Sequence, residues 1–162
     1  MSTRVGIGYD SHRFAAGRPL RIGGVTVPYT HGLVGHSDGD VALHAVVDAL
    51  LGAAGMGDIG QLFPDNDPQW RGADSTRFVR HTVETLRTAG HAVHQVDVTV
   101  VAERPKLAPL IEEMRTATAK ALGVEPSAVS VKAKTNEGMG WIGRGEGVAA
   151  LAVATLVQAA TG

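Results

Sequence analysis

The alternation of apolar and polar residues predicts β-structure at the beginning of the chain. Residues 5–9 read Val-Gly-Ile-Gly-Tyr, a short strand-like pattern, and two further apolar stretches, residues 20–22 and 25–28, flank the dipeptide Gly23-Gly24. Two glycines between such stretches are typical of a tight hairpin turn, because both central turn positions require positive φ. The N-terminal part is therefore predicted to contain a strand followed by a β-hairpin.

Three later segments carry apolar residues at helical spacing and are predicted to be helices. The first follows a polar loop in which Ser37, Asp38 and Asp40 are candidate caps, the second follows Asp74-Ser75, and the third begins after a proline. A glycine follows the second and the third, as expected where a helix ends. The predicted helices are Val41–Ala54, residues 75–89 and residues 110–122.

The remaining apolar segments are predicted to complete one sheet. Residues 94–101 alternate like a half-buried strand, and residues 129–133 form another short apolar stretch. The tail, residues 147–160, is small and apolar throughout, so its alanines favour a helix while the preceding glycines and the lack of a cap favour a strand. Because strands and helices mix without strict alternation, we expect one α+β domain spanning residues 1–162, a two-layer sandwich with helices on one face of a mixed β-sheet.

Composition narrows the class of protein. A chain of 162 residues can bury a core without disulfides or a structural metal, so a metal here is expected to be functional. The net charge of −1 without a basic stripe argues against nucleic acid as a partner, and the absence of a long apolar run argues against a membrane span. Because a strand is predicted within the first ten residues, we expect no targeting segment before it. The lack of cysteine excludes thiolate chemistry and fits a cytoplasmic enzyme.

One long loop and one group of aspartates and histidines are the first candidates for a functional site. Residues 55–72 contain four Gly, two Pro and three Asp, and loops of this length usually serve as lids or binding loops. Asp10-Ser-His12 is expected just after the first strand, where an extended backbone would project both side chains to one side. His44, with Asp48 on the same helix face, offers a third ligand. Asp, His and His suit a zinc site with an open fourth position, and the alternative for the first pair is a hydrogen-bonded surface pair.

Two familiar motifs are excluded by their context. His36, Ser37 and Asp38 are adjacent in a capping loop, and residues of a nucleophile triad come from separate elements. The structural interpretation is a loop that caps a helix, and the functional interpretation, compatible with it, is a helix N-terminus whose N–H groups and hydroxyl bind anionic oxygen. The sequence Gly138-Met-Gly-Trp-Ile-Gly143 matches a dinucleotide-binding pattern, but too few residues follow it for the rest of a βαβ unit.

Two short charged segments near the C-terminus have both a structural and a functional interpretation. Lys132, Lys134, Thr135 and Glu137 are expected in one loop after a strand, either as solvated charges or as ligands of an anionic substrate with a divalent ion. Residues 143–147 place an arginine and a glutamate between three glycines, either as a flexible turn or as a close contact with a phosphate or a symmetry mate.

Taken together, these motifs resemble the 2-C-methyl-D-erythritol 2,4-cyclodiphosphate synthase family in order, spacing and total length. The resemblance implies a phosphorus-oxygen lyase of non-mevalonate isoprenoid biosynthesis. Its reaction converts 4-diphosphocytidyl-2-C-methyl-D-erythritol 2-phosphate into the cyclic diphosphate and releases CMP. The motifs span essentially the whole chain: Asp10-Ser-His12, residues 36–44 and 48–52, Gly57-Asp58-Ile-Gly60, Phe63-Pro-Asp65, residues 132–137 and residues 143–147.

The resemblance also implies an assembly, two metals and a set of site residues. It implies a homotrimer with active sites between neighbouring subunits, a zinc ion on Asp10, His12 and His44, a magnesium or manganese ion on Glu137, and a strand for the tail. His36 and Thr135 would help to stabilise the transition state. The substrate-binding residues would be Asp10, His12, His36, Ser37, Asp58, Ile59, Gly60, Phe63, Pro64, Asp65, Asn66, Asp67, Ala102, Glu103, Arg104, Pro105, Lys106, Leu107, Ala108, Lys134, Thr135, Asn136, Glu137, Trp141 and Arg144.

Two other functions compete with the cyclodiphosphate synthase interpretation. A zinc phosphohydrolase would use Asp10, His12 and His44 to activate water, and it would release a linear phosphate. A trimeric binding protein for isoprenoid diphosphates would use Arg144 and Glu146 to line an apolar channel and would not release CMP at catalytic rates. In addition, Lys134 and Asn136 stand where some family members carry threonine, which affects the expected nucleotide contacts.

Overall fold

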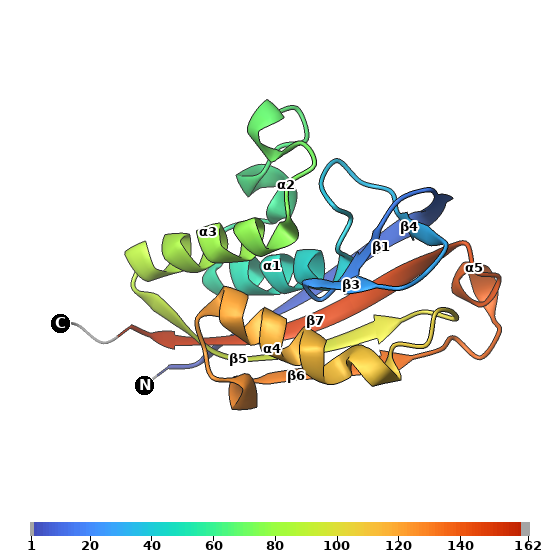
Figure 1. Ribbon diagram of the computed structural model, residues 1–162. Helices are drawn as coiled ribbons and strands as arrows, with labels where there is room; N and C mark the ends of the chain where they lie inside the picture. Colours follow the sequence, from blue (N-terminus) through green and yellow to red (C-terminus); the bar gives the residue numbers. More distant parts are fainter. Residues whose placement is uncertain (1, 160–162) are drawn as a thin grey trace.

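A five-stranded mixed sheet forms one layer of the protein (Figure 1). The computed structural model describes residues 2–159. The strand order is β4-β1-β7-β5-β6, in which β5 and β6 are parallel and the other neighbouring strands are antiparallel. The strands are β1 (Arg4–Ala16), β4 (His31–Leu33), β5 (His91–Val101), β6 (Val129–Lys134) and β7 (Gly147–Gln158).

Three helices cover one face of this sheet and form the second layer (Figure 1). They are α1 (Val41–Ala54), α3 (Ser75–Thr88) and α4 (Ile111–Leu122). None of the helices among the described residues is long and apolar enough to cross a membrane. The smaller elements are the hairpin β2 (Leu20–Ile22) and β3 (Val25–Val27), the short helices α2 (Ile59–Leu62) and α5 (Gly140–Gly143), and three 3-10 turns, η1 (Pro68–Trp70), η2 (Ala108–Leu110) and η3 (Pro126–Ala128).

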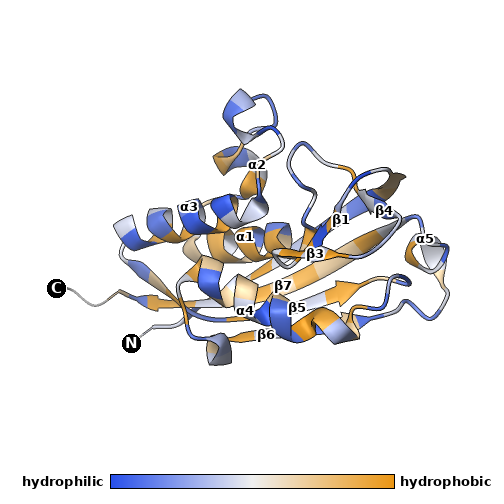
Figure 2. Cartoon of the chain, viewed as in Figure 1, coloured by the Kyte–Doolittle hydropathy of each residue, from blue (hydrophilic) through white to orange (hydrophobic). Residues whose placement is uncertain are grey.

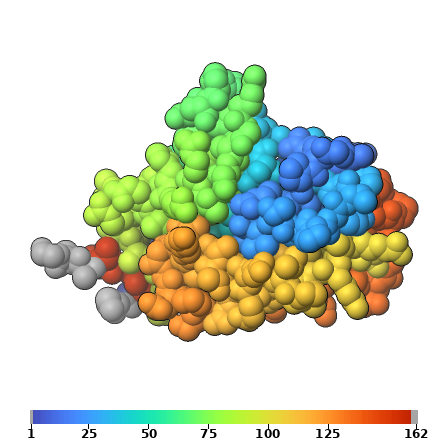
Figure 3. Space-filling view, in the orientation of Figure 1, coloured from blue at the N-terminus to red at the C-terminus, as the bar shows by residue number. Residues whose placement is uncertain are grey.

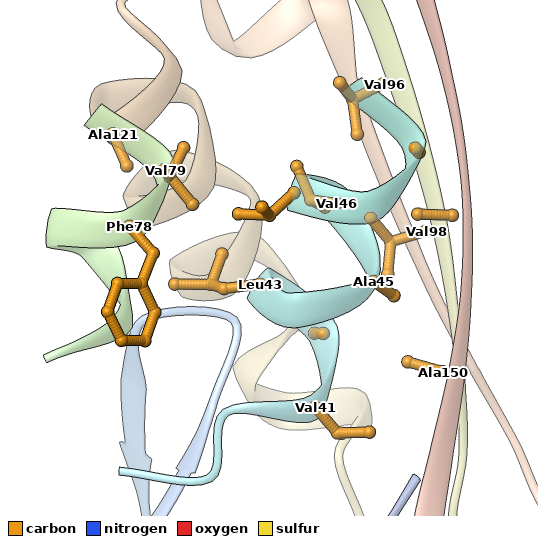
Figure 4. Close-up of a cluster of buried hydrophobic side chains, with 14 of the residues drawn as sticks. Val41, Leu43, Ala45, Val46, Phe78, Val79, Val96, Val98, Ala121 and Ala150 are labelled. Carbon is orange, nitrogen blue, oxygen red and sulfur yellow. The ribbon is translucent and has the colours of Figure 1, made fainter. Parts of the chain in front are cut away.

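Helix α1 lies at the centre of the core. It is buried nearly all round, because one side packs on the sheet while another faces α3 (Figure 4). Colouring by hydropathy shows that α3 and α4 carry both hydrophilic and hydrophobic residues, as expected of helices with one buried side (Figure 2). On the sheet side the helix backbone comes so close to β1 that a Cβ atom on Gly8 would lie 1.9 Å from the carbonyl oxygen of Ala45. The glycines of β1 therefore set the distance between the two layers.

Most elements occur where the hydrophobic pattern predicts them. Helix α1 has the predicted bounds, and the glycine pair forms the β2–β3 turn with φ of 63° and 77°. The tail, for which the pattern left helix and strand open, is a strand up to Gln158, as the family resemblance implied. Residue 160 of the predicted tail lies outside the described residues. The loop over residues 55–72 contains α2 and η1, and it projects from the body of the molecule (Figure 3).

Two predictions about the position of charged residues are wrong. Asp10 and His12 were expected just after the first strand, but β1 continues through them, because its partner β7 is long enough to pair with both. Lys132 and Lys134 were expected in a loop but belong to β6, where pairing with β5 extends the strand. Lys132 there forms an ion pair with Asp97 on the neighbouring strand, with 2.7 Å between Nζ and Oδ2.

The second face of the sheet is not covered by helices and carries large apolar side chains. Odd-numbered residues of β1 point to this side, and Ile7 is 69% exposed. An exposed apolar patch rimmed by polar residues usually marks an interaction surface. We call this patch the apolar face; it consists of Val5, Ile7, Tyr9, Leu151 and Val153.

Candidate functional site

Strand β1 and helix α1 bring the three predicted metal ligands together. Asp10 and His12 are two apart in β1 and face the helix layer, on the same side as Gly8. His44 lies in the first turn of α1, directly across from them. The close approach of α1 to β1 thus places one imidazole from the helix beside a carboxylate and an imidazole from the strand.

The start of α1 is held in place by Asp40. Its carboxylate accepts hydrogen bonds from the backbone N–H groups of Leu43, Gly23 and Gly24, at 3.1, 2.9 and 2.7 Å. Burial raises the pKa of Asp40, as does the nearby charge of Asp38, while the three N–H donors oppose this rise. Asp40 therefore joins the β2–β3 hairpin to the helix turn that carries His44.

The three ligand atoms form a small triangle. Asp10 Oδ2 lies 2.7 Å from His12 Nε2 and 3.2 Å from His44 Nδ1, and the two ring nitrogens are 3.2 Å apart. Ligands at about 2.0–2.1 Å from a tetrahedral zinc ion are roughly 3.4 Å apart, so these atoms need only small shifts to share one ion. The residues Asp10, His12 and His44 therefore fit a divalent cation.

The strongest charge interaction in this group joins Asp10 and His12. Burial by itself would raise the pKa of Asp10, but hydrogen bonds and charges from His12 and His44 outweigh it and lower the value to about 2. Burial lowers the pKa of His12, but Asp10 and the carbonyl oxygen of Val34 raise it more. His12 Nδ1–H donates to that carbonyl at 2.5 Å, which directs Nε2 toward the triangle.

A cleft of about 260 Å³ opens beside the triangle. One wall is the metal-ligand group, and the other is the projecting segment around α2. His36 belongs to the cleft, and its Nε2 atom is buried with no hydrogen-bond partner among the described residues, which suits contact with a ligand. The predicted site residues that line it are Asp10, His12, His36, Ser37, His44, Ile59, Gly60, Phe63 and Asp65.

Sequence reasoning missed an aromatic cluster that supports this cleft. Phe63 was predicted, but it packs on Trp70 and Phe78, with ring centroids 4.9 and 4.6 Å away, and both also line the cleft. Trp70 comes from the projecting segment and Phe78 from α3. Their apolar character and spacing look like ordinary core positions, so only the fold reveals their place at the site.

Asp48 does not join the metal-ligand group, although it shares a helix face with His44. Its carboxylate instead accepts a hydrogen bond from the backbone N–H of Ile59 at 2.8 Å. Burial raises the pKa of Asp48, as do the charges of Asp58 and Asp10, while that hydrogen bond lowers it. Asp58 caps α2 by accepting from Gln61 N at 3.0 Å. These two carboxylates therefore position the projecting segment.

A second group of predicted substrate residues follows the ends of β5 and β6, whereas Asp58, Pro64, Asn66 and Asp67 belong to the projecting segment. Glu103 accepts hydrogen bonds from the backbone N–H groups of Asn136 and Gly138, both at 3.0 Å, and thereby holds the loop that follows β6. Glu137 in this loop is exposed, with a left-handed φ of 54°. Arg144 forms an ion pair with Glu146 at 2.8 Å on the exposed turn before β7. This group does not contribute to the cleft at the triangle.

Strand register separates the two groups of site residues within one chain. Asp10 pairs with Ala150 of β7, Ala150 with Val100 of β5, and Val100 with Ala133 of β6. Three strand spacings amount to roughly 14 Å between the backbones of Asp10 and Ala133. The loop that carries Glu137 begins two residues beyond Ala133, so one chain holds two distant halves of the predicted site.

The fold and the site define a class of protein: an α+β protein with an aspartate–histidine cluster that could hold a metal ion at the edge of a cleft. Comparison with known proteins makes this class specific. Residues 3–157 match the sequence model of the YgbB family. The 2-C-methyl-D-erythritol 2,4-cyclodiphosphate synthase of Salinibacter ruber is 58% identical over 156 residues, which cover 96% of this chain and 99% of that protein.

Solved structures agree with the sequence comparison. A 2C-methyl-D-erythritol-2,4-cyclodiphosphate synthase in a CDP-bound form superposes with a TM-score of 0.87 at 39% identity, covering 95% of this chain and all of the other. The bifunctional IspDF of Campylobacter jejuni gives a TM-score of 0.93 at 39% identity, covering 97% of this chain and 42% of that one. The chain belongs to the YgbB family of 2-C-methyl-D-erythritol 2,4-cyclodiphosphate synthases. The resemblance and the lyase activity expected from it are confirmed at the level of the family.

Proposed function

We propose that this chain acts in the cytoplasm on 4-diphosphocytidyl-2-C-methyl-D-erythritol 2-phosphate. The product is 2-C-methyl-D-erythritol 2,4-cyclodiphosphate, an intermediate of non-mevalonate isoprenoid biosynthesis, and CMP is released. Family membership supports the reaction class. The observation that carries the proposal is the triangle of Asp10, His12 and His44 atoms in the wall of a cleft that can receive a diphosphate.

Two cations are part of this proposal. Two imidazoles and one carboxylate are a typical zinc donor set with an open fourth position. The exposed Glu137 carboxylate suits a magnesium or manganese ion, since hard cations prefer oxygen ligands. When bound, the two cations would act as Lewis acids and neutralise charge on the phosphate groups.

The residues of the chain orient a reaction between two anions. An oxygen of the 2-phosphate forms a bond to the β-phosphorus, the bond from that phosphorus to the oxygen of the α-phosphate breaks, and CMP leaves with that oxygen. Because both reacting groups are anionic, in-line orientation and charge neutralisation dominate the barrier. We propose that His36 and Thr135 form hydrogen bonds with the reacting phosphates. His36 Nε2 has no hydrogen-bond partner among the described residues, and Thr135 lies beside Glu137.

A hydrolase would use the same donors to activate water. The aromatic cluster of Phe63, Trp70 and Phe78 favours the cyclase, because apolar walls exclude water from a bound substrate. The test is incubation of the purified protein with the cytidine substrate and Mg²⁺, followed by phosphorus NMR. We expect a cyclic diphosphate together with an equal amount of CMP. A linear phosphate as the product would contradict the cyclase function.

The separation of the two half-sites supports a site shared between copies of the chain. In one chain Ala133, near the end of β6 from which the Glu137 loop extends, lies roughly 14 Å from Asp10, which favours contact of one diphosphate with Asp10 of one copy and Glu137 of another. We therefore propose a homotrimer in which each cleft is completed by the residues of the 102–108 and 134–137 segments of a neighbour. The apolar face provides a surface for such an assembly.

The trimer can be tested through the apolar face. Light scattering of the wild type should give a mass of about 50 kDa, three times the 16.8 kDa of the chain. Val153→Glu introduces a charge into the apolar face and should shift the mass toward that of one chain. Thr116→Glu places the same charge on exposed α4, on the opposite layer, and should leave the mass unchanged. A wild-type mass near 17 kDa at micromolar concentration would rule out the shared site.

A further inference from the structure

Beyond the three metal ligands, a buried hydroxyl contacts the far side of the His44 ring. His44 Nδ1 points into the triangle, and Nε2 lies on the opposite edge of the ring. Ser75 Oγ, from the first residue of α3, is 2.9 Å from Nε2, and Ser75 is fully buried. The proton positions in this contact decide which ring nitrogen is free to bind a metal.

The direction of the hydrogen bond from Ser75 is set by Asp38. Asp38 Oδ1 accepts from the backbone N–H of Asp40 at 3.0 Å, and Oδ2 accepts from the N–H of Ser75 at 2.9 Å. The Ser75 hydroxyl also contacts Asp38 Oδ1 at short range. A carboxylate offers acceptors only, so the hydroxyl must donate its single proton to Asp38.

This arrangement places a proton of the imidazole on Nε2. With its own proton committed to Asp38, Ser75 Oγ presents only lone pairs to His44, so Nε2 carries a proton and donates it. Nδ1 lies 3.2 Å from the carboxylate oxygen Oδ2 of Asp10 and can donate to it while no metal is bound. A metal ion at the triangle takes the place of a proton on Nδ1, and the ring then keeps its remaining proton on Nε2. The Ser37 hydroxyl, 3.1 Å from Nε2, is not contacted by a carboxylate and can turn to accept from the same N–H group.

The backbone around this chain of contacts is fixed on both sides. The N–H of Asp38 donates to the carbonyl oxygen of Ala73 at 3.1 Å, and the N–H of Gly72 donates to that of His36 at 2.9 Å. Two loops far apart in sequence are thus joined next to the N-terminus of α3. These backbone hydrogen bonds between the two loops therefore hold Asp38 next to Ser75.

We propose that Ser75, oriented by Asp38, is a positioning residue that holds His44 in the tautomer protonated at Nε2 and so presents Nδ1 to the metal. This inference rests on the proposed role of His44 as a metal ligand. Partners of this kind, which hydrogen-bond the other nitrogen of a ligand histidine, typically change metal affinity by 10- to 100-fold when removed. The structure thereby assigns to Ser75 and Asp38 a function beyond helix capping.

The direct test needs no variant of Ser75 or Asp38. Nitrogen NMR of the full-length, metal-free protein labelled at histidine reports which nitrogen of each ring is protonated, and the His44 signals are identified by their loss in His44→Ala. We expect His44 to carry a proton on Nε2, the atom that faces Ser75. A His44 ring without a proton on Nε2 in the wild type would overturn the proposal.

Zinc affinity, measured by competition with a chelator, provides the second test. Ser75→Ala and Asp38→Asn should each weaken zinc binding by about 10-fold or more. The double variant should bind zinc no more weakly than the weaker-binding of the two single variants, because both substitutions break the same chain of contacts. Thr82→Val removes another buried hydroxyl of α3, bonded only to the carbonyl oxygen of Phe78, and should leave zinc affinity unchanged.

The outcomes separate this inference from the metal assignment. If His44→Ala binds zinc as tightly as the wild type, the proposed metal centre is wrong and the role of Ser75 falls with it. If His44→Ala loses zinc while Ser75→Ala keeps wild-type affinity, only the positioning role is overturned. An equal loss of zinc affinity in Ser75→Ala and Thr82→Val would also overturn the positioning role, since removal of any buried hydroxyl of α3 would then have the same effect on zinc affinity.

Discussion

Glu137→Gln is expected to reduce turnover by about 100-fold or more while zinc remains bound. The substitution keeps the shape of the side chain and removes its negative charge. The backbone of the loop should persist, because it is held by Glu103 and by the contact of the Glu137 N–H with Thr135 Oγ1. The loss would therefore report the carboxylate that is proposed to bind magnesium or manganese.

The measurement is CMP release across a Mg²⁺ titration, with zinc content determined on the same samples. Glu125→Gln makes the same chemical change at an exposed loop position before η3 and should retain wild-type turnover. If Glu137→Gln stays within a few-fold of the wild type at every Mg²⁺ concentration, Glu137 has no part in the reaction. Loss of zinc in Glu137→Gln would show that the two cation sites are not separable.

The second large effect is expected for His44. We expect the wild type to contain about one zinc ion per chain after expression with sufficient metal, and His44→Ala to lose both zinc and turnover. Two remaining protein ligands, Asp10 and His12, bind zinc too weakly to keep it through purification. Elemental analysis and CMP release measure the two losses in the same preparation.

Because His44 is buried beside Phe78 and Ser75, removal of its ring also disturbs packing. His44→Gln retains a polar side chain at this position and separates the two effects. It should unfold close to the wild type in urea but still lack zinc. His94→Ala, at an exposed position of β5, is the matched control and should keep both zinc and activity. Wild-type zinc content in His44→Gln would contradict the metal assignment.

Under the proposed shared site, the reaction depends on a second half-site in addition to the cleft. The triangle and the projecting segment form one side, where the diphosphate would be bound. The loop held by Glu103 lies three strands away and carries the residues expected to contact the nucleotide. Joining the halves across an interface would make activity depend on assembly. Val153→Glu should then lower CMP release as well as the oligomeric mass.

Local patterns were sufficient for much of the fold. Helix α1 has its predicted bounds because apolar spacing, a capping aspartate and a final glycine act within one segment of chain. The β2–β3 turn follows from two adjacent glycines for the same reason. The beginning of β1 was also evident, and an extended backbone predicted that the side chains of Asp10 and His12 share one side, although the predicted strand ended before them.

Long-range packing decided what these patterns left open. The tail forms strand β7 because its small residues lie between β1 and β5 and beneath α1. The spacing of apolar residues within the tail does not indicate which segments it will pack against. Asp48 and His44 share a helix face, yet one contacts the backbone of Ile59 and the other meets Asp10, since different segments pack over each. Side-chain roles of this kind depend on which segments meet in space, and those contacts involve residues too distant in sequence for local chemistry to specify.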